Sequence, residues 1–214
     1  MTVDPNQHDV FLLRQKFKLV INQYEFFLPL SDDGAAAAPS KDLVGPRICF
    51  VEQKRFKFKE DIRFYVDESK TVELLAIKAR QRFDPRATYD VTDESGTKVG
   101  EIQKVFGASL LRSTYRINDA SGVELCVVTE KSMPIAIVRR LVGFIPYVDN
   151  ISDWLPIPYH FVFKRGEEII GQNTRQMWKI RDMYTIDMSA DPQHTIDRRL
   201  VLAIAVGMDA LQAR

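Results

Sequence analysis

Apolar and polar side chains alternate along most of this chain. In the segment 77–83, Ile77 and Phe83 share one side, while Lys78 and Arg80 lie on the other. Alternation with a period of two is typical of antiparallel strands that have one buried and one solvated face. The sequence therefore predicts a mainly β protein.

The same alternation places further strands along the chain. Residues 10–28 are expected to form two strands joined by a tight turn at Asn22-Gln23, and strands are expected again over 160–164 and 169–174. Residues 178–188 suit one long strand or a pair. About a dozen strands result from this count.

A turn built from Asp, Ser and Gly recurs between the strand-like segments. It occurs at 67–71, 93–97 and 119–123, with a weaker copy at 165–167. Asp and Ser side chains bond the backbone within such turns, and Gly accepts the positive φ that closes a hairpin. Each copy therefore predicts a β-hairpin, and a meander of so many hairpins is expected to curl and close.

The C-terminal segment has a different pattern. From Leu200 to Met208 there is no polar side chain, and Asp197 stands where a helix cap is expected. A helix that is apolar on all sides must be surrounded, and a bilayer crossing needs about 20 apolar residues. We expect a closed antiparallel barrel of about 12 strands wrapped around a buried hydrophobic C-terminal α-helix.

One barrel domain, residues 10–214, accounts for this pattern. We expect a flexible tail at 1–9, a mobile loop at 31–46, a helical and proline-rich insert at 133–159, and the central helix at 197–212. The loop carries an alanine run flanked by Gly and Pro, which break strand patterns.

Several of these stretches together resemble the LURP-one-related proteins of the tubby C-terminal-like superfamily, which includes the phospholipid scramblases. The resemblance is carried by residues 14–18 and 53–65, by the repeated hairpins and by the terminal helix at 197–211. It implies a twelve-stranded barrel threaded by that helix. Tubby domains bind phosphoinositide headgroups through basic residues on strands, and scramblases move lipids in a calcium-dependent way. The sequence shows neither the proline-rich arm nor the cysteine cluster of scramblases.

Composition narrows the function classes. The 214 residues carry a formal net charge of +1, which does not favour a nucleic-acid partner. The two cysteines, Cys49 and Cys126, form no C-x-x-C pair, so we expect buried reduced thiols. No secretory signal precedes the first strand, so we expect a cytoplasmic protein that can associate peripherally with a membrane.

No catalytic constellation stands out. The three histidines form no evident Cys–His pair, and the sequence contains no nucleophile elbow, phosphate loop or dinucleotide fingerprint. Asp187, Asp191, His194 and Asp197 lie close together, but proline and capping roles explain the carboxylates better than a metal does. We therefore expect a non-enzymatic protein with no catalytic residue, no metal and no cofactor.

Two groups of residues are candidates for binding. The first is a basic strand face suited to anionic headgroups, and its alternative is a face that is merely solvated. It comprises Lys54, Arg55, Lys57, Lys59, Lys78, Arg80, Arg82 and Arg86. The second lies in the insert and suits a membrane interface or a protein partner, unless the insert only caps the barrel. It comprises Arg139, Arg140, Trp154, Leu155, Ile157 and Tyr159.

These candidates give a ranked set of functions. The first is a scaffold or binding protein that holds anionic lipid headgroups or a membrane surface through the basic strand face. The alternative is a protein–protein interaction module that uses the insert. A small-ligand carrier or a scramblase-like lipid transporter ranks third. The oligomeric state has no signal in the sequence.

Overall fold

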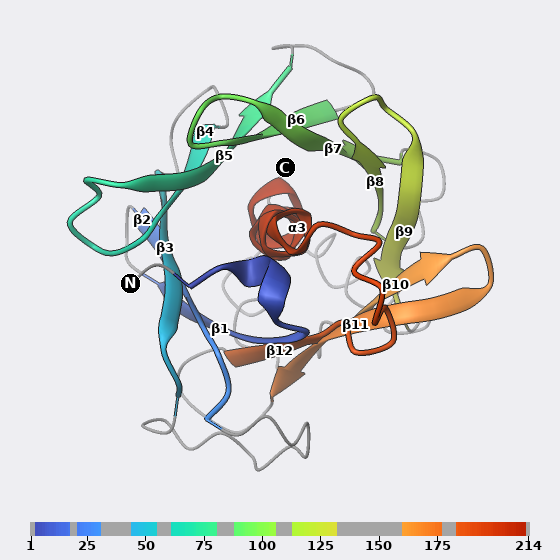
Figure 1. Cartoon of the computed structure of the whole chain (residues 1–214), viewed down its shortest axis with the longest axis horizontal. Helices are drawn as coiled ribbons and strands as arrows, with labels where there is room; N and C mark the ends of the chain where they lie inside the picture. Colours follow the sequence, from blue (N-terminus) through green and yellow to red (C-terminus); the bar gives the residue numbers. More distant parts are fainter. Residues whose placement is uncertain are drawn as a thin grey trace, which may run out of the picture.

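The computed structural model describes residues 3–17, 21–30, 44–54, 61–80, 88–105, 113–131, 160–176 and 183–212. These residues form twelve strands around a helix (Figure 1). The strands are β1 (Val10–Phe17), β2 (Ile21–Phe27), β3 (Arg47–Lys54), β4 (Asp61–Tyr65), β5 (Glu73–Ala79), β6 (Thr88–Asp93), β7 (Lys98–Lys104), β8 (Thr114–Asp119), β9 (Glu124–Glu130), β10 (His160–Arg165), β11 (Glu168–Gln176) and β12 (Met183–Asp187). The helices are the short 3-10 helix η1 (Pro5–Gln7) and α3 (Arg198–Gln212).

The sheet is a closed up-and-down barrel. Each strand pairs antiparallel with its neighbours in the sequence, and β1 closes the barrel by pairing with β12 from Val10↔Asp187 to Arg14↔Met183. Closure leaves no free edge among the twelve described strands. The predicted fold class, a closed antiparallel barrel around a C-terminal helix, is confirmed.

Helix α3 runs through the middle of the barrel (Figure 1). Between Leu200 and Met208, its large apolar side chains are at most 3% exposed. Gly100 on β7 lets the helix approach the wall, since a Cβ there would lie 2.9 Å from a Leu200 methyl carbon. Asp197 caps the helix by accepting from the Arg199 N–H at 2.9 Å, as its position in the sequence predicts. Within the described residues, no helix combines the length and apolarity needed to cross a bilayer.

Strand direction sorts the connections to two ends of the barrel. At one, here called the turn end, lie the connections 28–46, 66–72, 94–97, 120–123 and 166–167, together with 3–9 and 188–197. At the other, here called the far end, six pairs of strand termini face out: Phe17 and Ile21, Lys54 and Asp61, Ala79 and Thr88, Lys104 and Thr114, Glu130 and His160, Gln176 and Met183. The helix enters at the turn end, so its C-terminus points to the far end.

The predicted hairpins form as their sequences suggest. In the β6–β7 turn, Asp93 Oδ1 accepts from the backbone N–H groups of Ser95 and Thr97 at 3.0 and 2.9 Å, and Gly96 has φ 82°. The β8–β9 turn repeats this with Asp119 and with Gly122 at φ 91°. In the β4–β5 turn, Lys70 takes the glycine position with φ 58°.

Two expectations differ from the structure. Asn22 and Gln23 do not form a turn but lie within β2, opposite Phe17 and Lys16, because the ladder between β1 and β2 continues through these positions. The N-terminal residues 3–9 do not behave as a loose tail. They form η1 and bond to the start of α3, because Asn6 and Asp9 supply acceptors that the helix start lacks.

The predicted loop at 31–46 lies outside the described residues except for 44–46. There, Gly45 N–H donates to the Leu28 carbonyl at 2.8 Å, which extends the ladder between β2 and β3. The predicted insert at 133–159 lies wholly outside the described residues. Its flanks are joined, since Lys131 N–H donates to the His160 carbonyl at 2.8 Å.

Candidate functional site

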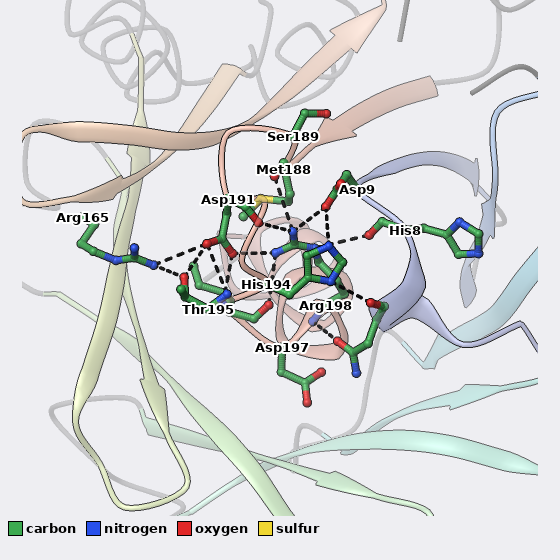
Figure 2. Close-up of polar contacts among 12 residues, drawn as sticks. His8, Asp9, Arg165, Met188, Ser189, Asp191, His194, Thr195, Asp197 and Arg198 are labelled. Carbon is green, nitrogen blue, oxygen red and sulfur yellow. Dashed lines mark hydrogen bonds and ion pairs between the residues drawn. The ribbon is translucent and has the colours of Figure 1, made fainter. Parts of the chain in front are cut away.

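A fully buried arginine stands at the turn end, in the first turn of α3 (Figure 2). Arg198 Nη1 donates to Asp191 Oδ2 at 2.8 Å and to the Ile196 carbonyl at 3.2 Å. Its Nη2 donates to Asp9 Oδ1 at 2.6 Å and to the Asp191 carbonyl at 2.9 Å. The guanidinium is therefore engaged from several sides, which is what a buried cation requires.

Asp191 is equally engaged. Its Oδ1 accepts from the Thr195 hydroxyl at 2.5 Å, and its Oδ2 accepts from the Ile196 N–H at 3.2 Å in addition to Arg198. Burial raises the pKa of Asp191, but the hydrogen bonds from Thr195 and Arg198 outweigh it and hold the pKa below its usual range. The carboxylate oxygens are used inside the protein, so this cluster stabilises the fold. Among the described residues no group of three His, Cys, Asp or Glu side chains is arranged to hold a metal.

The N-terminal segment completes this cluster. Asn6 Oδ1 accepts from the Arg198 backbone N–H at 2.8 Å and so satisfies a free donor of the first helical turn. His194, with φ 50°, places Nδ1 2.7 Å from the Asn6 carbonyl oxygen and Nε2 3.1 Å from Asp9 Oδ1. These contacts join the chain start to the entry of the helix (Figure 2).

Two residues of the predicted basic face, Lys78 and Arg80, have described side chains on the outer wall of the barrel. Lys78 on β5 is exposed, whereas Arg80 is paired with two carboxylates. Its Nη2 lies 2.7 Å from Asp90 and 2.5 Å from Glu101. Burial raises the pKa of Glu101, but hydrogen bonds from Lys98, Asn118 and Arg80 lower it to about 2. This network neutralises Arg80, which therefore has little charge left for an external anion.

The remaining predicted binding residues fall outside the described side chains. Lys54 ends β3 opposite Ile21, and its side chain is not described. The other members of the basic group, Arg55, Lys57, Lys59, Arg82 and Arg86, lie outside the described residues, as do the insert residues Arg139, Arg140, Trp154, Leu155, Ile157 and Tyr159. The described strand ends that flank all of them nevertheless belong to the far end.

Charge is divided unequally between the two ends. The connections at the far end, 18–20, 55–60, 80–87, 105–113, 131–159 and 177–182, contain thirteen Lys and Arg and five Asp and Glu, a net charge of +8. Those at the turn end, with 1–9 and 188–197 included, contain two Lys and eleven Asp and Glu, a net charge of −9. The overall charge of +1 hides this separation.

The inner wall of the barrel is divided in the same direction. Toward the turn end, every strand has an apolar side chain or a glycine at its inward position. They are Phe11, Phe26, Cys49, Phe64, Leu75, Val91, Gly100, Ile117, Cys126, Phe163, Ile170 and Ile186. These residues surround the first half of α3 and form the core.

Toward the far end, eight strands and the residue before β8 instead present a polar group on the same inner face. Side chains two residues apart on a strand face the same side, so strand pairing shows which polar residues face the same way as the core residues. On β2, for example, Asn22 faces the same side as the core residues Tyr24 and Phe26. They are Gln15, Asn22, Gln53, Tyr89, Lys104, Ser113 just before β8, Glu130, Tyr184, and on β11 both Asn173 and Arg175. We call them the inner polar ring.

Several members of the ring are deeply buried. Gln15, Glu130 and Asn173 are at most 3% exposed, and Asn22 is 8% exposed. Glu130 Oε2 accepts from the Ser113 N–H at 3.1 Å. The side-chain oxygens of Asn22 and Asn173 are buried without a hydrogen-bond partner among the described residues. Buried polar atoms are nearly always bonded, so these two oxygens are exceptions, as is Asn118 Oδ1 outside the ring.

The inner polar ring was not predicted from the sequence. The alternation that identifies strands places Gln15 beside Leu13 on one face, and a face with this composition is read as core from the local sequence. Among the described residues, the polar inward positions gather toward the far end, a pattern that appears only once strand pairing and strand direction are known.

Both cysteines are buried and free, as expected. Burial raises the pKa of the Cys126 thiol to about 12, and it also raises the pKa of the Cys49 thiol. Thiols in such surroundings are poor nucleophiles.

Comparison with known proteins gives one match. The model of the LURP-one-related family matches residues 47–209, from the first residue of β3 into α3. No curated protein and no solved structure matches the chain. Because the family match covers well over half of the chain, this protein belongs to the LURP-one-related family.

Proposed function

We propose that this protein is a non-enzymatic binding protein that docks on anionic lipid surfaces through the far end of its barrel. The observation that supports this proposal is the separation of charge, +8 in the far-end connections and −9 in the turn-end connections. The proposal places the docking surface at this end of the barrel, where most of the basic group expected on a strand face lies in or beside the connections. Docking would be peripheral and cytoplasmic.

Electrostatics favours one orientation. Each Lys or Arg close to an anionic membrane contributes about 1 kcal/mol, and the attraction falls off within a Debye length of about 8 Å at physiological salt. The 15 residues of α3 span about 22 Å, so the acidic turn end lies more than two Debye lengths from a membrane at the far end. Its repulsion is therefore largely screened.

The helix dipole cannot account for the charge separation. The C-terminus of α3 points to the far end and carries about half a negative charge, which suits nearby cations. Half a charge is far smaller than the net charge of +8 of these connections, in which only Arg80 is shown paired within the protein. The excess supports an external anionic partner.

The same connections carry large apolar side chains in addition to cations. Trp154, Leu155, Ile157 and Tyr159 are in the segment between β9 and β10. Aromatic and aliphatic residues combined with Lys and Arg suit the membrane interface, where apolar groups enter the headgroup region and cations pair with lipid phosphates. Their presence favours a lipid surface over a purely electrostatic ligand.

Vesicle co-sedimentation tests the proposal. The protein is expected to pellet with vesicles of phosphatidylcholine and phosphatidylserine and to stay in the supernatant with phosphatidylcholine alone. Changing Lys57 and Lys59 to Ala should reduce the pelleted fraction. The matched control changes Lys41 and Lys70, the two basic residues of the turn-end connections, and should leave binding unchanged. Equal losses for both pairs, or equal pelleting with both lipids, would contradict the proposal.

A further inference from the structure

We infer that the turn end of the barrel is a docking surface for the far end of a second copy of this chain, so that copies associate head to tail. The surface is formed by the hairpin tips around the entry of α3 (Figure 1), and the tips are the connections 66–72, 94–97, 120–123 and 166–167. This contact goes beyond the proposed function and does not require a membrane.

Exposed apolar side chains gather at this end. Among the described residues, four large hydrophobic side chains are exposed, by 51% to 61%: Leu30, Val72, Val123 and Ile169. The first three lie in turn-end connections, and Ile169 follows the last tip by two residues. Because they belong to four different connections, they suit a broad contact between two barrel ends rather than a pocket for a small ligand.

The tips also carry carboxylates. Glu94 and Glu167 are exposed, and no ion pair within the described part of the chain includes either of them. In the three repeated turns, Asp67, Asp93 and Asp119 accept hydrogen bonds from a serine hydroxyl two residues on, and these bonds hold the pKa of each carboxyl below its usual range. The tips are therefore built to stay negatively charged.

Nearby cations do not neutralise these carboxylates. Every described Lys and Arg in or directly beside a turn-end connection forms an ion pair with a different carboxylate, on the barrel wall or at the start of α3. These cations are Arg47, Lys70, Lys98, Arg165 and Arg198. A partner that covers the tips must therefore bring its own cations together with apolar groups.

A second copy of the chain has this chemistry. Its far-end connections have a net charge of +8 and contain Trp154, Leu155, Ile157 and Tyr159. Complementary charge steers the two ends together and opposes contact between like ends. Since the two surfaces in contact are different, the interface is heterologous, and copies add in a row instead of closing as a symmetric dimer.

The size of a barrel end suits a stable contact. Twelve strands about 4.8 Å apart and tilted by about 40° form a circle with a radius of about 12 Å. Outward side chains add about 5 Å, half the spacing of packed sheets. The resulting disc of about 900 Å² is close to the roughly 800 Å² per partner of a standard protein interface.

Sedimentation velocity of the whole chain tests for this contact. The average mass should rise with protein concentration at 0.1 M salt, beyond that of a dimer. At 1 M salt it should fall toward the monomer, because the Debye length shrinks from about 10 Å to about 3 Å.

Two variants of equal charge test whether the tips are responsible. Glu94→Gln with Glu167→Gln removes two tip carboxylates and should weaken the association about tenfold at 0.1 M salt. The matched control, Gln172→Lys with Thr174→Lys, changes the net charge by the same amount on the outer wall of β11 and should leave the association unchanged.

Cross-linking identifies the two ends in contact. A bis-maleimide should react only with introduced cysteines, since Cys49 and Cys126 are buried. Copies with Glu94→Cys should cross-link to copies with Ser109→Cys, which lies in a far-end connection, whereas neither should cross-link in a sample of its own. Gln172→Cys, on the outer wall, should cross-link to neither.

Three results would overturn the inference. They are a constant monomer mass at 0.1 M salt, equal weakening by the tip and wall variants, and cross-linking of Glu94→Cys copies with one another, which marks a symmetric contact. Membrane docking is judged separately by vesicle co-sedimentation. A single copy and a row of copies both keep one far end free for a lipid surface, so failure of either proposal leaves the other standing.

Discussion

Arg198 Nη1 and Asp191 Oδ2 form a 2.8 Å ion pair in which both side chains are almost completely buried, at 0% and 3% exposure. The pair joins the first turn of α3 to the connection that follows β12. Asp9 extends it to the chain start at 2.6 Å from Arg198 Nη2. Because desolvated charges must stay paired, this contact fixes the depth of the helix in the barrel.

Removing the arginine alone should be severely destabilising. Arg198→Met leaves Asp191 and Asp9 without their cation, and breaking a buried pair in this way costs about 3–5 kcal/mol. Urea unfolding followed by tryptophan fluorescence measures the loss. A double variant, Arg198→Met with Asp191→Leu, should recover part of it, because no uncompensated charge at Asp191 remains. A double variant as unstable as the sum of the single ones would contradict this account of the pair.

The N-terminal contact makes a separate prediction. Asn6→Ala removes the acceptor of the Arg198 backbone N–H, and loss of such a cap costs about 1 kcal/mol. Gln7→Ala alters the exposed neighbouring residue and should have no measurable effect. Equal unfolding midpoints in urea for both variants would show that the Asn6 cap contributes nothing measurable to the stability of the barrel.

Lys70 is a place where the protein can be stabilised. It has φ 58° at the turn position that glycine fills at Gly96 and Gly122. Lys70→Gly should raise the free energy of unfolding by about 0.5–1 kcal/mol through relief of backbone strain. The exposed Lys70–Glu52 pair is lost in this variant and reduces the gain only slightly. In the converse change, Gly96→Lys, the added Cβ has no atom within 4 Å. The variant should therefore be destabilised only by the strain of a non-glycine residue at positive φ.

Glu101 predicts a pH dependence. Its pKa is lowered from 4.5 to about 2 in the folded protein, so the folded state binds the proton more weakly than the unfolded chain. The stabilisation is therefore fully present above about pH 4.5 and is lost as the pH falls toward 2. Glu101→Gln should cost about 1–3 kcal/mol at pH 7 and much less at pH 2. A constant difference between the two proteins from pH 7 to pH 2 would contradict the role of the charge.

The architecture was predictable because its signals are local. The Asp-Ser-Gly turns bond their own backbone within five residues, and the segment Leu200–Met208 can only be a surrounded helix. The first turn was misplaced because Asn22 and Gln23 have turn-forming composition. Their inward and outward positions in β2 are set by pairing with β1, which the local sequence does not reveal.

The candidate site was less predictable because its determinants are non-local. Arg80 looks cationic in the sequence, but Asp90 and Glu101 reach it from the two following strands and neutralise it. The inner polar ring draws its members from eight strands and the residue before β8, and each member alone is an ordinary polar residue. The charge separation likewise appears only after strand direction assigns each connection to an end.

Site-specific labelling tests most directly which end of the barrel faces the membrane. Cys49 and Cys126 are buried, so a thiol-reactive, environment-sensitive dye should label only an introduced cysteine. Ser109→Cys lies in a far-end connection, and Glu94→Cys lies at the exposed tip of the β6–β7 turn. On adding phosphatidylserine vesicles, the dye at position 109 should shift to shorter wavelength while the dye at position 94 stays unchanged. A response at position 94 equal to or larger than that at position 109 would contradict docking by the far end.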